Sequence, residues 1–166
     1  MEKNLYLLAE LDENTQILIK NYEKVIVENG FIGKQTNDIP YHITLGCYSL
    51  EHEIYLRDLL DNIGKNSKQI NIAYSGFGLF KLDVLYLNPA ISIGLMDLYN
   101  LVKEKCCYKD HDFSAHTTLF MDEPENILKI LPKFVEIFEK IQGKIKYISL
   151  YEFFPKRLIQ RIELKE

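Results

Sequence analysis

Two short segments of this chain share one pattern, in which a histidine is followed at +2 by threonine and at +3 by leucine. Residues 41–48 read YHITLGCY, and residues 113–121 read FSAHTTLFM. Side chains two residues apart on a β-strand point to the same face of the sheet. His42 therefore shares a face with Thr44, while the apolar residues between them point to a core. The repeat predicts two related halves, each presenting an imidazole beside a hydroxyl.

The same residues allow two other interpretations. Each histidine could be an ordinary core side chain that is hydrogen-bonded to a neighbouring strand. A metal site is the second alternative, because His111 lies five residues before His116 and is flanked by Asp110 and Asp112. Zinc usually takes three or four ligands at characteristic spacings, and no third ligand is forced here. A chain with only 5 threonines and 23 leucines in 166 residues rarely matches the pattern twice by coincidence, so we favour a paired site.

The composition is that of an ordinary globular protein, with 47% hydrophobic and 27% charged residues. We expect one domain, residues 1–166, formed by two intertwined lobes, and a monomer. The net charge of −4 gives no general attraction to a nucleic-acid backbone. Cys47, Cys106 and Cys107 form neither a disulfide framework nor a metal motif, which predicts a cytoplasmic location. The chain shows neither a signal peptide nor an apolar run of about 20 residues that would span a membrane.

The order of the expected elements is that of an α+β protein. Apolar runs predict strands at 4–11, 41–48, 69–81, 84–89, 113–121, 144–154 and 157–164. Helical spacing predicts helices at 13–30, 50–64, 91–106 and 122–141, the last of them kinked or divided at Pro132. The buried face of the first helix is expected at Ile17, Leu18, Tyr22, Val25 and Ile26.

The paired motifs resemble those of the 2H phosphoesterase superfamily, whose members carry two His-x-Thr or His-x-Ser motifs. The similarity is greatest to its 2′-5′ RNA ligase-like or cyclic phosphodiesterase-like branch. YSGFGLFKLDVLYLNP (74–89) resembles the central hairpin of that branch, and IKYISLYEFFPKRLIQRIEL (145–164) resembles its closing strand pair. The resemblance implies two pseudo-symmetric lobes, each an antiparallel sheet with helices packed on its outer face, and an active groove between them.

The resemblance also implies a reaction and its residues. His42 and His116 would serve as general acid and base, and Thr44 and Thr118 would hold the phosphate, without a metal or another cofactor. The expected activity is hydrolysis of a 2′,3′-cyclic phosphate or a 2′-5′ phosphodiester in a nucleotide, oligonucleotide or RNA end. The alternatives are 2′-5′ ligation of RNA ends and a nucleotide-binding module without catalysis. The acid and base assignment stays open, with His42 taken as acid and His116 as base.

Other residues are candidates for contacts with the rest of the substrate. Tyr48 and Phe120 could stack on a base, as could Tyr41 and Tyr151. Lys34, in the loop before the first motif, could meet a phosphate. Two departures from the family pattern bear on the substrate. Phe120-Met121 stands where related bacterial proteins often carry an arginine, which argues against a long RNA, and GCYSL (46–50) differs from the usual run after the first motif.

Overall fold

The computed structural model describes residues 3–35, 38–108 and 112–166. In this part of the chain the strands form one seven-stranded antiparallel sheet, with four α-helices and one 3-10 helix between them. The strands are β1 (Asn4–Leu11), β2 (His42–Tyr48), β3 (Ile70–Phe80), β4 (Val84–Pro89), β5 (Thr117–Met121), β6 (Ile141–Phe153) and β7 (Arg157–Glu163). The helices are α1 (Glu13–Glu28), η1 (Leu50–His52), α2 (Glu53–Asn66), α3 (Ile93–Val102) and α4 (Pro124–Ile137).

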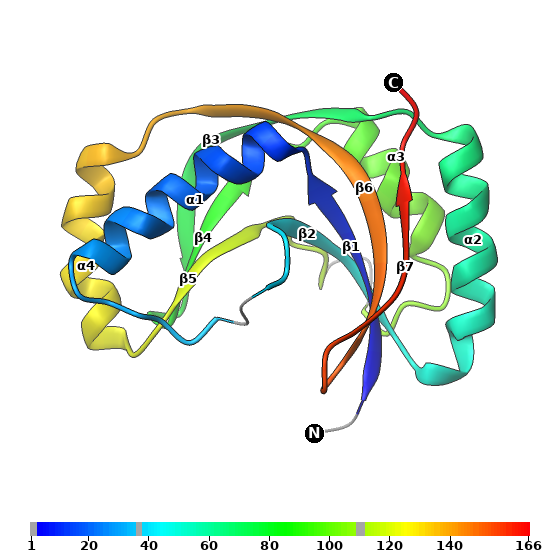
Figure 1. Cartoon of the computed structure of the whole chain (residues 1–166), viewed down its shortest axis with the longest axis horizontal. Coiled ribbons are helices and arrows are strands. Elements are labelled where there is room, and N and C mark those ends of the chain that lie inside the picture. Colours follow the sequence, from blue (N-terminus) through cyan, green and yellow to red (C-terminus); the bar gives the residue numbers. More distant parts are fainter. Residues whose placement is uncertain (1–2, 36–37, 109–111) are drawn as a thin grey trace.

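The sheet is strongly bent, so that its two ends approach each other. Its strands follow the order β2-β1-β6-β3-β4-β5, and β7 pairs with β6 off this path. Five of the six described strand pairings contain a register shift, and such bulges bend a strand and increase its twist. The sheet forms an arch in Figure 1, and the end strands β2 and β5 contact each other. Each of these end strands carries one of the two histidine motifs.

The helices cover the sheet in two groups, which define the two lobes. Helices α1 and α4 pack on each other, and α1 also contacts β5 and β6. Helix α2 packs against β6 and β7, and α3 packs against β2 and β3. Figure 1 shows α1 and α4 at one end of the arch and α2 and α3 at the other. The predicted α+β fold with two lobes is therefore confirmed, although the two lobes share one continuous sheet.

The alternation expected in the two motifs is present. Ile43 and Leu45 are fully buried in the hydrophobic core, whereas His42 and Thr44 are only half-buried. In the second motif the residue between histidine and threonine is polar, yet Thr117 is also fully buried. Its hydroxyl lies 2.6 Å from the Tyr74 hydroxyl, so the buried polar group is satisfied.

The helix boundaries differ from the sequence predictions at several points. Helix α4 continues past Pro132 and ends at Ile137, so the proline does not divide it. Proline leaves the carbonyl four residues earlier without its helical partner, and that residue, Leu128, is 51% exposed, where water can reach it. Helix α3 ends at Val102 rather than near Cys106. In the described residues, no helix has both the length and the apolar character needed to cross a bilayer.

The predicted buried face of α1 is correct at Ile26, and Tyr22 packs partly buried against the core, but the prediction is wrong at Ile17 and Leu18. The helix buries Thr15, Ile19, Glu23 and Ile26, while Ile17 is 60% exposed and Leu18 is 45% exposed. The cause is that α1 has a sheet on one side and a cleft on another, so apolar residues at helical spacing do not all face the core.

Replacement of two neighbouring residues of β2 tests the alternation. We expect Leu45→Ala to lower the free energy of unfolding by about 2–5 kcal/mol, because it removes a fully buried side chain from the core. Thr44→Ala removes a half-buried side chain on the other face and should cost less than about 1 kcal/mol. Urea denaturation of both variants measures the difference, and equal losses would contradict the assigned faces.

Candidate active site

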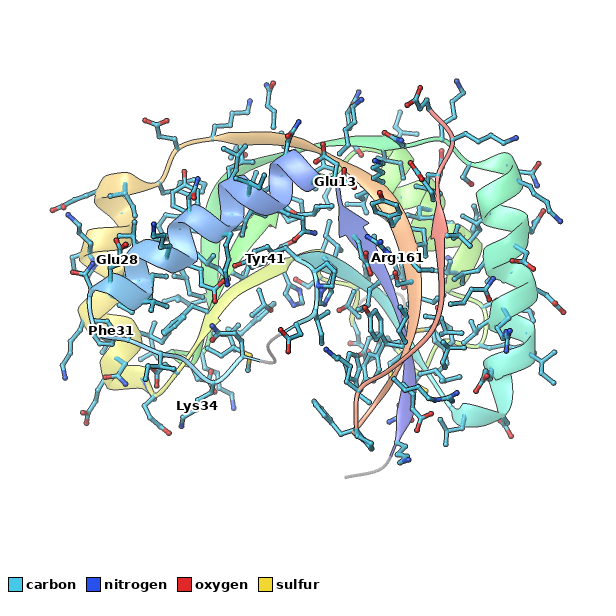
Figure 2. The ribbon with its side chains drawn as sticks, viewed as in Figure 1. Glu13, Glu28, Phe31, Lys34, Tyr41 and Arg161 are labelled. Carbon is cyan, nitrogen blue, oxygen red and sulfur yellow. The ribbon has the colours of Figure 1, made fainter. Side chains whose placement is uncertain are left out.

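A cleft of about 830 Å³ lies on the concave side of the sheet. His42 and Thr44 from β2 line it together with Thr118 from β5. The cleft is also bounded by β1, by one side of α1, by the loop before β2 and by the end of β6. Figure 2 shows Tyr41, the residue before the first motif, on this concave side of the arch. The two motif strands, distant in the sequence and in the strand order, therefore contribute to the same cavity.

The two histidines are held in the same way. Nδ1 of His42 lies 2.7 Å from the carbonyl oxygen of Pro40, and Nδ1 of His116 lies 2.7 Å from that of Ser114. A carbonyl oxygen only accepts hydrogen bonds, so each Nδ1 carries a proton and donates it. In the neutral form of either ring, Nε2 is then the nitrogen that can accept a proton. This matched contact, to the residue two positions earlier, repeats the symmetry of the two lobes.

His116 packs against two aromatic rings that come from the central hairpin. The centroid of its ring lies 4.7 Å from that of Phe80 and 5.6 Å from that of Tyr86, both in edge-on geometry. Phe80 and Tyr86 stack on each other, with ring centroids 4.3 Å apart. A side chain at Gly78 would collide with the Tyr86 ring, because its Cβ would lie 2.5 Å from the hydroxyl oxygen. Glycine at position 78 therefore makes room for the ring that supports His116.

The environment of His42 is electrostatically different. Burial lowers the pKa of His42 below its ordinary value, because the charged imidazolium loses hydration. The hydrogen bond to Pro40 and the carboxylate of Glu10 oppose this shift, and a positive charge on His116 adds to it. The lowering of the pKa favours a neutral His42.

Glu10 is a carboxylate in the middle of the sheet and is fully buried. It pairs with His42 across β1 and β2. Its oxygens accept hydrogen bonds from the Ser149 hydroxyl and from Nε of Arg161, the latter at 2.7 Å. The Arg161 guanidinium in turn lies 3.8 Å from the centre of the Tyr147 ring. Buried carboxylates need such partners, and this one places a fixed negative charge next to a motif histidine.

Sequence reasoning missed Glu10, Phe80 and Tyr86. The available signal for Glu10 was a single carboxylate within an otherwise apolar strand, YLLAEL (6–11). The two aromatic residues lie in the segment that resembles the central hairpin, but their contact with His116 depends on the pairing of β4 with β5, where Tyr86 lies opposite Thr118.

Three of the four predicted stacking residues, Tyr48, Phe120 and Tyr151, are buried, and the fourth, Tyr41, lines the cleft. Tyr48 and Phe120 are both fully buried, so neither offers a ring face to a ligand. The Tyr48 hydroxyl donates to the Val102 carbonyl oxygen at 2.6 Å, which ties it to α3. Of the other two candidates, Tyr151 is 5% exposed, whereas Tyr41 lines the cleft and donates its hydroxyl to Glu23.

Lys34 lies outside the cleft. Its ammonium group forms an ion pair with Glu123, and both side chains are largely exposed. Figure 2 shows Lys34 at the rim of the arch, away from Tyr41. The predicted contact with a bound phosphate therefore has no support in the structure.

The metal alternative rested partly on His111 and Asp110, which lie outside the described residues. Within the described residues, no group of three or more histidine, cysteine or carboxylate side chains is placed to hold a metal ion.

The contact between Tyr86 and His116 can be tested with two neighbouring glycines. Gly78→Ala should displace the Tyr86 ring and with it His116, and we expect a fall in turnover of about 10- to 100-fold. Gly76→Ala is the matched control, because a Cβ there has no atom within 4 Å. Turnover of a cyclic nucleotide measures both variants. Equal activity of the two would show that the aromatic support is unimportant.

The effect of Glu10 on His42 can be tested by titration. Glu10→Gln should lower the pKa of His42 further, because the carboxylate favours the charged imidazolium. Glu13→Gln makes the same change of charge at a side chain that is 64% exposed and should leave His42 unaffected. NMR titration of the imidazole protons measures both. An unchanged pKa in Glu10→Gln, in a variant with a native circular dichroism spectrum, would contradict this coupling.

Comparison with known proteins identifies the fold. No protein-family model matches the chain, and no curated protein sequence matches it significantly. Among solved structures, it is similar to a protein described as a phosphoesterase, with a TM-score of 0.64, 16% identity and coverage of 99% of both chains. It is also similar to Escherichia coli LigT in complex with 3′-AMP (TM-score 0.63, 15% identity, 100% of both chains). TT0787 of Thermus thermophilus gives a TM-score of 0.69 with 13% identity over 98% of both chains. Along its whole length, this chain therefore has the fold that these three structures share.

Proposed function

We propose that this protein is a 2H phosphoesterase that hydrolyses a 2′,3′-cyclic phosphate or a 2′-5′ phosphodiester of a nucleotide or RNA end, without a metal. The observation that carries the proposal is that residues of both motifs, from opposite ends of the sheet, line one cleft: His42 and Thr44 of the first motif and Thr118 of the second. His116 is not among the lining residues, but a charge on it acts on His42. The shared fold supports it, and E. coli LigT, whose structures include complexes with 3′-AMP and ATP, supports a nucleotide as ligand.

The reaction requires one proton to be removed and another to be supplied. Water attacks phosphorus on the side opposite the leaving ribose oxygen, and a new P–O bond forms as the P–O bond to that oxygen breaks. A neutral imidazole takes a proton from the attacking water, and an imidazolium gives a proton to the leaving oxygen. Histidine suits both roles because its ordinary pKa of about 6.5 lies near neutral pH.

The environment of the two rings favours one assignment. The lowered pKa of His42 favours its neutral form, which is the form that a general base needs. We therefore assign the base to His42 and the acid to His116, opposite to the assignment taken from the sequence. After turnover His42 holds the proton from water and His116 has lost one, so exchange with solvent restores the starting state. The activity should rise with pH through the pKa of His42, which lies below the ordinary histidine value.

The two threonines are assigned to the phosphate. Thr44 and Thr118 line the cleft from the two facing strands, and both are half-buried. Their hydroxyls can donate hydrogen bonds to the non-bridging oxygens as negative charge develops there. Two donors that approach from opposite walls would hold the phosphate between the two imidazoles.

Turnover of defined substrates in EDTA tests the proposal. The wild-type protein should hydrolyse 2′,3′-cyclic AMP or 2′-5′ diadenylate, and His42→Ala and His116→Ala should each lower turnover by about 10²–10⁴-fold. A nucleoside 4-nitrophenyl phosphodiester separates the roles, because nitrophenolate leaves without being protonated. His116→Ala should recover most of its activity on this ester, whereas His42→Ala should not.

Several outcomes would contradict the proposal. Hydrolysis that survives both substitutions would exclude the two-histidine mechanism. Binding of nucleotides without turnover would select the non-catalytic module, and the joining of RNA ends would select the ligase. Loss of activity in EDTA that zinc restores would select a metal enzyme. Recovery of His42→Ala rather than His116→Ala on the nitrophenyl ester would reverse the assigned roles.

A further inference from the structure

One end of the cleft is aromatic. Tyr6 from β1 and Phe153 and Phe154 from the end of β6 line it, and we refer to these three residues as the aromatic corner. The ring centroids of Tyr6 and Phe153 are 5.4 Å apart, and those of Phe153 and Phe154 are 5.3 Å apart. Phe154 is 52% exposed. Rings that face an open cavity, rather than the core, can accept a planar ligand by stacking.

The aromatic corner lies beside the proposed phosphate site. On β1, Leu8 pairs with Thr44, and Tyr6 lies two residues further along and pairs with Cys47. Leu8 and Tyr6 both line the cleft, and two residues of a strand span about 7 Å. A group that is held at Thr44 thus lies roughly one ribose away from the aromatic corner. This spacing fits a nucleotide whose phosphate is at the threonines and whose base reaches the aromatic rings.

The cleft offers little to a second phosphate. Its charged lining among the described residues consists of Lys20, Glu23 and Asp38. The ammonium group of Lys20 lies 2.7 Å from a carboxylate oxygen of Glu23, so its charge is already paired. A polynucleotide needs cationic side chains along its backbone, and the described lining supplies none that is free of an acidic partner.

The basic residues near the turn of the β6–β7 hairpin also have hydrogen-bond or ion-pair partners. Arg157 donates to Glu152 at 2.6 Å and to Glu53 at 3.0 Å, and Lys3 lies 3.1 Å from Glu152. Lys156 donates to the Asp38 carbonyl oxygen at 2.9 Å, which joins the hairpin to the loop before β2. Figure 1 shows this hairpin and this loop on the two sides of the concave opening. The contact therefore joins the two sides of the opening.

We infer that the cleft binds a mononucleotide that carries one phosphodiester, with its base stacked in the aromatic corner, rather than the end of a long RNA. The inference rests on the proposed function and narrows its substrate class. It moves base recognition from Tyr48 and Phe120, which are buried, to rings that face the cavity. It also agrees with the absence of an arginine after the second motif, where Phe120 and Met121 stand.

Comparison of substrate lengths tests the inference with the full chain. Adenosine 2′,3′-cyclic phosphate and a decaadenylate with the same cyclic end should give kcat/KM values within about threefold of each other. The slope of log kcat/KM against log salt concentration should be about −0.7 for both substrates, because a single phosphate contact contributes that amount. A decamer that is more than about tenfold better, with a slope steeper than about −2, would overturn the inference but leave the proposed hydrolysis intact.

Substitution of the aromatic corner supplies the second arm. The wild-type preference for adenosine 2′,3′-cyclic phosphate over ribose 2′,3′-cyclic phosphate, which has no base, should fall about 5- to 100-fold in Phe154→Ala. Phe154→Leu keeps an apolar side chain but has no ring, and it should lower this preference by a similar factor. Leu158→Ala is the matched control, because Leu158 is 50% exposed in the same hairpin and does not line the cleft.

The outcomes distinguish an error in the assignment of the base from an error in the proposed hydrolysis. An unchanged preference in both Phe154 variants would overturn the assignment of the base, while hydrolysis of the cyclic phosphates would still stand. If the wild-type protein hydrolyses none of the three substrates, the proposed function fails, and the inference fails with it.

Discussion

The bending of the sheet into an arch is the constraint on which the site depends. The two motif strands, β2 and β5, occupy opposite ends of a six-strand path. In a flat sheet they would be five strand spacings apart, about 24 Å. That distance exceeds the reach of two side chains around one phosphate. The register shifts along the path bend the strands, so two edges that would otherwise be distant line a common cleft.

The two halves of the site are alike in backbone and different in surroundings. Nδ1 of each histidine donates a hydrogen bond to the carbonyl oxygen two residues earlier, so the local structure repeats. His42 has a buried carboxylate as its cross-strand neighbour, whereas His116 lies against two aromatic rings. Enzymes commonly give two similar groups different roles by such differences in environment. The symmetry of the fold therefore does not imply that the two rings are interchangeable.

Periodicity within a strand predicted the motif faces correctly, because alternation fixes them locally. Periodicity could not predict features that depend on segments distant in the sequence. A bulge, which depends on pairing with the neighbouring strand, separates Tyr48 from Thr44 and Phe120 from Thr118, so both rings turn into the core. There Tyr48 bonds to α3 and Phe120 lies against the loop at Gly33. The prediction for α1 failed at Ile17 because that side chain lines the cleft. Likewise, Glu10 shows its role only once β1 has paired with β2 and β6, because its partners are far away in the sequence.

The motif residues and the aromatic corner lie on different parts of the sheet, and this separation affects how such a protein can change in evolution. The motif histidines and threonines belong to the two ends of the sheet path. Two of the three residues of the aromatic corner lie instead where β6 passes into β7, a strand that pairs only with β6 among the described strands. The strands of this hairpin also carry Ser149 and Arg161, which hold Glu10 beside His42, so only the turn between them can be exchanged without disturbing that contact. Selectivity could then diversify through this turn, while the strands that position the histidines are kept.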